Sequence, residues 1–256
     1  MSSLTLTDDD TATAAQRALH LVLLPGMDGT GDLFAPLIEA LGDAFTLQVV
    51  RYPVDRPANY DELASLVRAL LPRDRPYLLL GESFSGPIAV TLAAQAPAGL
   101  RGLMLCCSFV RNPHPWAAWL RPLARVVPLK AMPVRSLAWF LLGRASSARW
   151  RSALAQTLAQ VSPATMRARL QAVLTVDVSA AWARVTVPTL CLRAAQDRVV
   201  PAAASRLVTA LRPTTQVVEL TGPHFLLQVA PDEAARAIRA FVRSLSSHNS
   251  LAENRG

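Results

Sequence analysis

The chain has 256 residues, of which 52% are hydrophobic, and it carries a formal net charge of +8 at neutral pH. This length suits one large domain with a sizeable buried core, and the apolar content excludes a mostly disordered chain. No uninterrupted apolar stretch approaches the roughly 18 residues that are needed to span a bilayer, so no transmembrane helix is predicted.

The N-terminal residues and the cysteines indicate the compartment. Residues 1–10 are polar and end in three aspartates, where a secretory signal would carry basic residues followed by an apolar run. The three cysteines, Cys106, Cys107 and Cys191, lie in apolar runs and lack the spacing of metal ligands or of a disulfide framework. We therefore expect a cytoplasmic protein with buried free thiols and no metal site.

Strand-like and helix-like segments alternate through the first 110 residues. The predicted strands are continuous apolar runs, typical of a parallel sheet buried on both faces, at residues 19–24, 46–51, 77–80 and 103–107. The predicted helices lie between and after them, at residues 33–41, 60–71 and 87–95. This alternation predicts an α/β fold with a doubly wound, mostly parallel sheet.

The alternation stops near residue 111 and resumes near residue 186. Residues 111–185 show helical periodicity without a convincing strand, and their prolines divide them into short helices. Two further strands, at 187–192 and 216–220, and two helices, at 202–211 and 231–245, complete the pattern. We predict about six strands in a core made of residues 17–110 and 186–245, an inserted helical cap at 111–185, and flexible tails at 1–16 and 246–256.

A serine stands between the third strand and the helix that follows it. The motif Gly-Glu-Ser-Phe-Ser-Gly at residues 81–86 places Ser83 at the apex of a sharp strand-to-helix turn, where the N–H groups of the helix start point at the same spot. This pattern predicts that Ser83 is a catalytic nucleophile. The alternative is that the small residues only make a tight connection, with Ser83 as a helix cap.

An acid and a base follow the last two strands. Asp197 comes after the strand at 187–192, and His224 comes after the strand at 216–220. Because loops at the carboxyl ends of parallel strands gather at one edge of the sheet, we expect both side chains to meet Ser83, with His224 as the base and Asp197 orienting it. Taken singly, Asp197 is also suited to cap the helix that begins near Pro201, and His224 to be an ordinary loop residue.

The loop after the first strand is rich in turn residues. We predict that the backbone N–H groups of Met27 and Phe84 form an oxyanion hole, and that Gly26 lies close to the substrate. A phosphate-binding loop is the competing interpretation of these glycines. It receives little support, because neither a following Gly-Lys-Ser/Thr nor the dinucleotide-binding glycine spacing is present.

Together these motifs resemble the α/β-hydrolase fold superfamily, over about residues 17–245. The resemblance rests on the loop at 25–27, the elbow at 81–86, Asp197 and His224, with residues 111–185 in the place of the family's helical cap. In two respects the chain departs from the usual pattern. Ser85 replaces the second glycine of Gly-x-Ser-x-Gly, and Pro25 precedes Gly26 where the family usually has a histidine. Two early strands that are common in the family have no counterpart in this chain, so we expect a core sheet of about six strands. The resemblance implies no metal or organic cofactor.

The function implied is a serine hydrolase that cleaves a carboxylic ester or thioester through an acyl-enzyme intermediate. His224 would take the proton of Ser83, Ser83 would attack the acyl carbonyl, and water would release the acid. Two alternatives stay open. The same residues serve an acyltransferase, in which an alcohol replaces water, and a hydrolase-like small-molecule receptor would keep them idle.

The predicted cap bears on the substrate and on partners. Its aromatic side chains would line an acyl pocket, although helical spacing is more typical of packing: Trp116, Trp119, Trp139 and Phe140, with Met132 and Met166. The segment also carries eleven Lys and Arg against one acid, Asp177. Scattered arginines usually form a solvated face, yet this excess suggests an acidic partner such as an acyl-carrier protein, a coenzyme A thioester or an anionic membrane surface. Nucleic acid is not expected, because no binding motif accompanies the charge.

Overall fold

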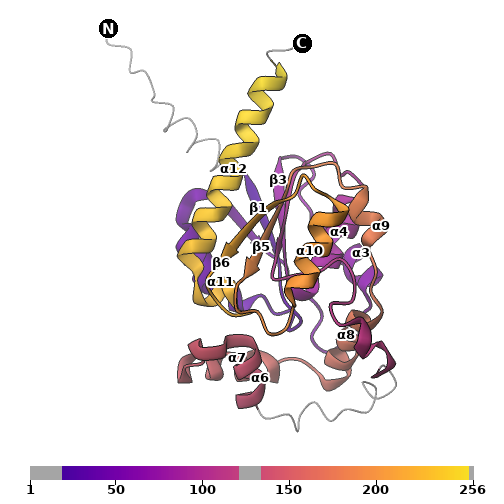
Figure 1. Cartoon of the computed structure of the whole chain (residues 1–256), viewed down its shortest axis with the longest axis vertical. Coiled ribbons are helices and arrows are strands. Elements are labelled where there is room, and N and C mark those ends of the chain that lie inside the picture. The colour runs from indigo at the N-terminus through magenta and orange to yellow at the C-terminus, as the bar shows by residue number, and fades with distance from the viewer. Residues whose placement is uncertain (1–18, 121–133, 254–256) are drawn as a thin grey trace.

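The computed structural model describes residues 19–120 and 134–253, and these form an α/β fold built on one sheet (Figure 1). Its six strands are all parallel and lie in the order β2-β1-β3-β4-β5-β6. Their bounds are β1 His20–Leu24, β2 Thr46–Val49, β3 Tyr77–Glu82, β4 Leu100–Cys106, β5 Thr189–Ala194 and β6 Gln216–Leu220. The predicted parallel sheet of about six strands is confirmed.

Helices cover both faces of the sheet because the strands alternate apolar side chains between them. One face packs against α3 (Tyr60–Leu70), α4 (Gly86–Ala93), α9 (Ser179–Ala183) and α10 (Ala202–Leu211); the other packs against α2 (Ala35–Leu41), α11 (Leu226–Val229) and α12 (Pro231–Glu253). In β3, Leu79 faces the first group and Leu78 and Leu80 face the second, and all three are fully buried. Each such leucine contributes roughly 1.5 to 3 kcal/mol by its burial.

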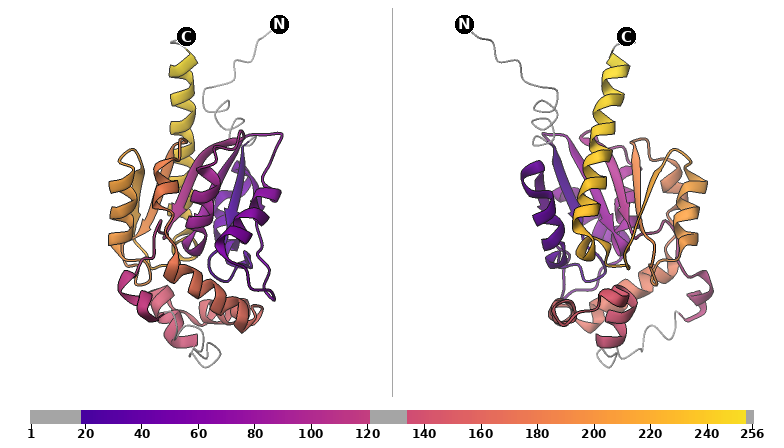
Figure 2. Two further views of the ribbon diagram at one scale, coloured as in Figure 1. Left: turned by 90° about the vertical axis from the view of Figure 1, so that its right-hand side faces the viewer. Right: turned by 60° about the vertical axis from the view of Figure 1, so that its left-hand side comes forward.

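The predicted helical insert is present between β4 and β5. It comprises η4 (Pro115–Leu120), α6 (Val134–Leu142), η6 (Gly143–Ala145), α7 (Ala148–Ala159), α8 (Pro163–Thr175) and α9. Its first residue pairs with the segment between α8 and α9 through an isolated bridge between Arg111 and Asp177. The helices α6, α7 and α8 lie across the end of the sheet at which the strands finish, whereas α12 extends beyond the opposite end (Figures 1 and 2).

Several element ends differ from their predicted positions. Strand β3 includes Gly81 and Glu82, because the pairing with β4 continues to the start of the turn. Helix α12 continues to Glu253 and does not end at Leu245, since residues 246–253 contain neither proline nor glycine. Cys106, Cys107 and Cys191 are buried free thiols, as predicted. Within the described residues, no helix combines the length and the apolar character of a transmembrane segment.

Candidate active site

A sharp turn places Ser83 at the carboxyl end of β3. The strand ends at Glu82, Ser83 opens the short 3-10 turn η3 (Ser83–Ser85), and α4 follows at once. Ser83 has a φ of 49°, and such a conformation costs a non-glycine residue on the order of 1 to 3 kcal/mol. A strained serine between a strand and a helix is the arrangement of a nucleophile elbow.

Close packing accounts for both glycines of the elbow. A Cβ on Gly81 would lie 2.8 Å from the carbonyl oxygen of Ser85, and a Cβ on Gly86 would lie 1.8 Å from Oγ of Ser108. Ser108 is held there because its hydroxyl donates a hydrogen bond of 2.6 Å to the carbonyl of Ser83. The second glycine is therefore required at position 86, one residue later than in the usual pattern.

Ser85, which takes the place of the usual glycine, connects the elbow to the loop after β1. Its side chain is fully buried, and its hydroxyl donates to the carbonyl oxygen of Pro25. The Tyr52 hydroxyl lies 2.7 Å from the same Oγ and donates to it, because the Ser85 proton is already used. Burial raises the pKa of Tyr52 far above its ordinary value, so the tyrosine keeps its proton.

The structure brings Ser83, His224 and Asp197 into one chain of hydrogen bonds. Oγ of Ser83 lies 2.9 Å from Nε2 of His224, and Nδ1 of His224 lies 2.8 Å from Oδ2 of Asp197. The side chains of His224 and Asp197 are only 4% and 6% exposed. A carboxylate can only accept, so Nδ1 of His224 carries the proton and Nε2 is free to accept from the serine.

Asp197 is held by its own loop as well as by His224. Its Oδ1 accepts hydrogen bonds of 2.8 Å from the backbone N–H groups of Val199 and Val200. It does not cap α10, whose N-cap is Pro201. The carboxylate is thus fixed on one side by backbone donors and directed on the other side at the imidazole, which sets the ring's orientation.

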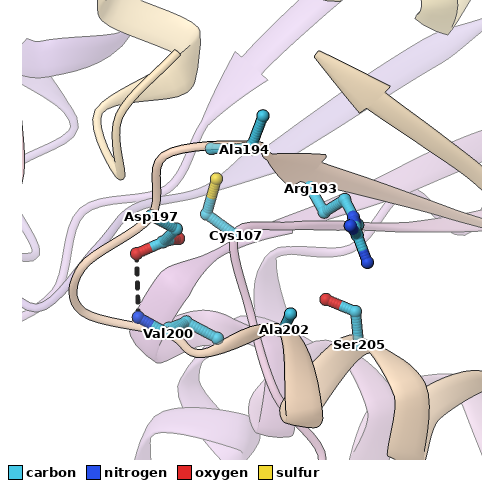
Figure 3. A pocket seen from close by; sticks show the side chains of 8 residues that line it. Cys107, Arg193, Ala194, Asp197, Val200, Ala202 and Ser205 are labelled. Atoms are coloured by element: carbon cyan, nitrogen blue, oxygen red, sulfur yellow. Dashed lines mark hydrogen bonds between the residues drawn. The ribbon is translucent and has the colours of Figure 1, made fainter. Parts of the chain in front are cut away.

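A cavity of about 60 Å³ lies beside Asp197. Figure 3 shows Cys107 and Asp197 facing it, with the dashed bond from Asp197 to Val200. The side chains of Cys107, Asp197 and His224 bring three ligand atoms within 4.8 Å of one another. This set suits a metal poorly: a hydrogen bond with Cys106 and burial raise the pKa of the Cys107 thiol well above its usual range, and metals bind the thiolate.

The loop at residues 25–28 is held on both sides of the Met27 N–H. On one side, the Gly26 N–H donates to the carboxyl of Glu82. On the other, Arg169 donates to the carbonyl oxygen of Met27 at 2.8 Å. The Met27 N–H itself has no hydrogen-bond acceptor within the described residues. The Phe84 N–H belongs to the first turn of η3, where no carbonyl of the same helix can satisfy it. Both predicted oxyanion donors therefore remain available for a ligand.

Two polar side chains of the site, Glu82 and Gln228, were not predicted. Glu82 directly precedes Ser83 and is buried, which raises the pKa of its carboxyl to about 7. The side-chain amide of Gln228, on α11, donates a hydrogen bond of 2.9 Å to it. Sequence patterns do not reveal such a pair, because its members are 146 positions apart.

Arg169 was not predicted either, although it left a signal. It stands three positions after Met166 and four before Val173, on the apolar stripe of its helix, where an arginine is out of place. The structure buries it to 1% exposure, and its guanidinium reaches the loop at residues 25–28.

The aromatic residues of the cap that were predicted to line a pocket have exposed side chains. Trp116, Trp119, Trp139 and Phe140 are 68%, 74%, 52% and 50% exposed. Trp139 and Phe140, with Arg135 and Ser136, line an open hollow of about 340 Å³. The guanidinium of Arg198 covers the ring of Trp139 at 4.0 Å. These aromatic side chains form neither a packed core nor a closed acyl pocket in this structure. Met132 lies outside the described residues.

The chain is similar to known proteins of one family. The model of the alpha/beta hydrolase family matches residues 15–237. A pimeloyl-[acyl-carrier protein] methyl ester esterase of Stenotrophomonas maltophilia (strain K279a) is 30% identical over 248 residues, which cover 90% of this chain and 95% of that protein. The enzyme of the same name from Xylella fastidiosa (strain M23) is also 30% identical over 248 residues, with coverages of 88% and 95%.

Solved structures share the fold at low sequence identity. A bromoperoxidase from Bacillus anthracis superposes with a TM-score of 0.78 at 18% identity, covering 88% of this chain and 92% of that one. The enol-lactonase of Burkholderia xenovorans LB400 gives 0.77 at 18% identity with the same coverages. The family model spans most of the chain, and on that ground the chain belongs to the alpha/beta hydrolase family.

Proposed function

We propose that this chain is a carboxylic-ester hydrolase in which Ser83 is the nucleophile, His224 the general base and Asp197 the residue that orients the base. The observation that carries the proposal is the continuous chain of hydrogen bonds from Ser83 through His224 to Asp197. Membership of the alpha/beta hydrolase family and the esterase names of relatives aligned over 88% to 90% of the chain support the same reaction class.

In the first half of the reaction, the ester acylates Ser83. Nε2 of His224 takes the hydroxyl proton as the serine oxygen forms its bond to the acyl carbon. The N–H groups of Met27 and Phe84 stabilise the negative charge that develops on the carbonyl oxygen. The bond from carbon to the alcohol oxygen then breaks, and the proton on His224 passes to the departing alcohol.

In the second half, water removes the acyl group. Nε2 of His224 takes a proton from the water, whose oxygen attacks the acyl carbon. The bond to Ser83 breaks, the serine oxygen recovers the proton from His224, and the free acid leaves. Asp197 remains ionised throughout, and it stabilises the imidazolium that forms in each half.

For the substrate, we propose an ester at the end of an acyl chain that an acyl-carrier protein presents. The relatives named above act, by their names, on a pimeloyl group on such a carrier. The inserted segment contributes solvent-exposed arginines that suit an acidic carrier: Arg111, Arg135, Arg144, Arg149 and Arg184. Trp139 and Phe140 would offer apolar contact beside them.

Covalent labelling tests the proposed nucleophile. A fluorophosphonate probe, which reacts with activated serines, is expected to label the wild-type chain at Ser83. The Ser83→Ala variant is expected to remain unlabelled, and Ser108→Ala, which removes a neighbouring hydroxyl, serves as the control for labelling elsewhere. Folded wild-type protein that takes up no label would contradict the proposal and would favour a small-molecule receptor.

Product analysis tests the reaction. Wild-type protein is expected to release acid from p-nitrophenyl esters and from the methyl ester of a carrier-bound dicarboxylic acyl chain, and to cleave matched acyl thioesters more slowly. Added alcohol would divert the acyl group to a new ester if the chain is an acyltransferase. Transfer that exceeds hydrolysis at low alcohol concentration would overturn the assignment as a hydrolase.

A further inference from the structure

The contacts of Arg169 point to a second role for the inserted segment. We propose that Arg169 is a positioning residue for the oxyanion loop, residues 25–28, so that helix α8 of the insert sets the direction of the Met27 N–H. This inference rests on the proposed function, because it assigns Met27 to the stabilisation of the oxyanion.

Arg169 is a buried cation whose partners are backbone carbonyls. Its Nη1 donates to the carbonyl oxygens of Met27 and Asp28 at 2.8 and 2.7 Å, and its Nη2 donates to that of Pro53 at 2.8 Å. No carboxylate forms a salt bridge with it within the described residues, and burial lowers its pKa. A long apolar side chain would fill this space without the cost of burying a charge. The guanidinium instead supplies several N–H donors in a fixed planar arrangement.

The loop leaves space for the guanidinium of Arg169. Gly29 has a φ of +70°, and a Cβ there would lie 2.6 Å from Nη1 of Arg169. The centre of the guanidinium lies 5.7 Å from the centroid of the Tyr52 ring, within the range of a cation–π contact. Gly29 is therefore required by the position of Arg169 as well as by its own backbone conformation.

The peptide that carries the Met27 N–H lies between two fixed neighbours. In the peptide before it, the carbonyl of Pro25 accepts from Ser85 and the N–H of Gly26 donates to Glu82. In the peptide after it, the carbonyl of Met27 accepts from Arg169. Because a peptide unit is planar, fixing both neighbours limits the rotation that turns the Met27 N–H.

The two fixed points come from different parts of the chain. Ser85 and Glu82 belong to the elbow, so the first neighbour moves with Ser83 itself. Arg169 belongs to α8, which lies at the end of the sheet where the strands finish (Figure 1). If α8 moved away from the core, the carbonyl of Met27 would lose its hydrogen bond to Arg169, while the contacts of the preceding peptide with the elbow would remain. The direction of the Met27 N–H therefore depends in part on the docking of this helix, since the Gly26 carbonyl of the same peptide also accepts from the N–H of Gly29 at 3.1 Å.

Substitutions of Arg169 test the proposal on a short p-nitrophenyl ester, which needs no carrier. Losing one oxyanion donor lowers turnover by roughly 10² to 10³, so Arg169→Met, which loosens but keeps the donor, is expected to lower kcat by about tenfold or more. KM is expected to change by less than about threefold, because the loss falls on the transition state. Lysine donates from a single point, so the kcat of Arg169→Lys is expected to lie between that of the wild type and that of Arg169→Met.

The control is Arg167→Met on the same helix, because Arg167 is half-buried and the hydrogen bonds to the loop come from Arg169. Amide hydrogen exchange gives a readout independent of activity. Faster exchange is expected in a peptide covering residues 25–31 for Arg169→Met and not for Arg167→Met. Unchanged kcat and unchanged exchange in folded Arg169→Met would overturn the proposal. If the wild type shows no esterase activity, the proposed function fails while the exchange experiment still tests the contact.

A double variant separates positioning from general destabilisation. Gly29→Ala is expected to displace the guanidinium and lower kcat much as Arg169→Met does. In the double variant the two losses should add only in part, because the alanine then has no guanidinium to displace and only the strain of its own backbone at a φ of +70° remains. Fully additive losses in kcat would show that Gly29 and Arg169 act separately and would contradict the proposal.

Discussion

The side-chain amide of Gln228 donates a 2.9 Å hydrogen bond to the carboxyl of Glu82, the residue directly before Ser83. Both side chains are buried, at 3% and 7% exposure, and the same carboxyl accepts the N–H of Gly26. An ionisable group therefore lies beneath the elbow and supports the oxyanion loop. Its protonation affects the stability of the fold in a direction that can be measured.

Stability is expected to fall as pH rises through the range in which Glu82 titrates. The pKa of Glu82 is raised from 4.5 to about 7 by burial, so between these values the folded state binds more protons than the unfolded state. The free energy of unfolding should lose about 3 kcal/mol from this group over that range, at roughly 1.4 kcal/mol per pKa unit. Urea unfolding at pH 5, 6, 7 and 8 measures the slope.

Glu82→Gln removes this titration and should flatten the profile between pH 5 and 7. The matched control is Glu39→Gln on α2, because Glu39 is exposed and should leave the profile as it is in the wild type. A Glu82→Gln profile as steep as that of the wild type would show that another group carries the dependence.

Asp197→Asn is expected to lower kcat by about 10⁴, as the loss of the orienting carboxylate does in other serine hydrolases. The amide can present its NH₂ group to Nδ1 of His224, which favours the tautomer with the proton on Nε2, and that nitrogen then cannot accept from Ser83. Steady-state kinetics on a p-nitrophenyl ester measures the loss. A fall of less than tenfold would argue that His224 does not depend on Asp197.

Gly86→Ala is expected to destabilise the fold by about 1 to 3 kcal/mol, the usual cost of overpacking a filled core. The new methyl group would meet Oγ of Ser108 at 1.8 Å and its Cβ at 2.8 Å. Ser108→Gly in the same chain removes both atoms and should restore part of the loss, which thermal unfolding can detect. If Ser108→Gly instead added its full single-variant loss of stability to that of Gly86→Ala, the clash with Ser108 would not be the cause of the destabilisation.

Ser85→Ala is expected to cost about 1 to 3 kcal/mol, because it leaves the buried hydroxyl of Tyr52 and the carbonyl of Pro25 without their partner. Adding Tyr52→Phe removes one orphaned group, so the double variant should be less destabilised than the sum of the two single variants. Urea unfolding of the four proteins tests this. Strict additivity would contradict a shared hydrogen bond.

Charge reversal of Arg144 and Arg149 to glutamate is expected to raise KM for a carrier-bound ester by tenfold or more and to leave a p-nitrophenyl ester unaffected. Both side chains are exposed on the inserted segment. The effect should shrink as salt is added, because surface charges are screened. The matched control for net charge reverses two exposed arginines at the opposite end of the sheet, where strands begin: Arg73, before β3, and Arg101, in β4. An equal rise in KM for both substrates would place the defect at the site and not at a docking surface.

The sequence alone determined the parallel sheet and the three residues that meet at its edge. Apolar strands that alternate with amphipathic helices bury both faces of their sheet when the strands are parallel. Parallel neighbours are joined by right-handed crossovers, and the carboxyl ends of the strands then lie at one edge of the sheet. Ser83, Asp197 and His224 each follow such a strand, so their meeting follows from topology. The local motif around Ser83 and the order of the three residues along the chain then predicted the nucleophile, the base and the orienting acid.

Only the tertiary structure decided what supports these residues. Arg169 lies 142 positions from Met27, and Gln228 lies 146 from Glu82, so no local pattern identifies either partner. The place of Arg169 on the apolar stripe of α8 indicates burial and not what it binds. Ser85 likewise departs from the glycine of the usual pattern, and its bond to Pro25 shows why a hydroxyl is accommodated. Buried polar groups take whichever partner the packing of distant elements brings within about 3 Å, and a one-dimensional pattern does not contain that distance.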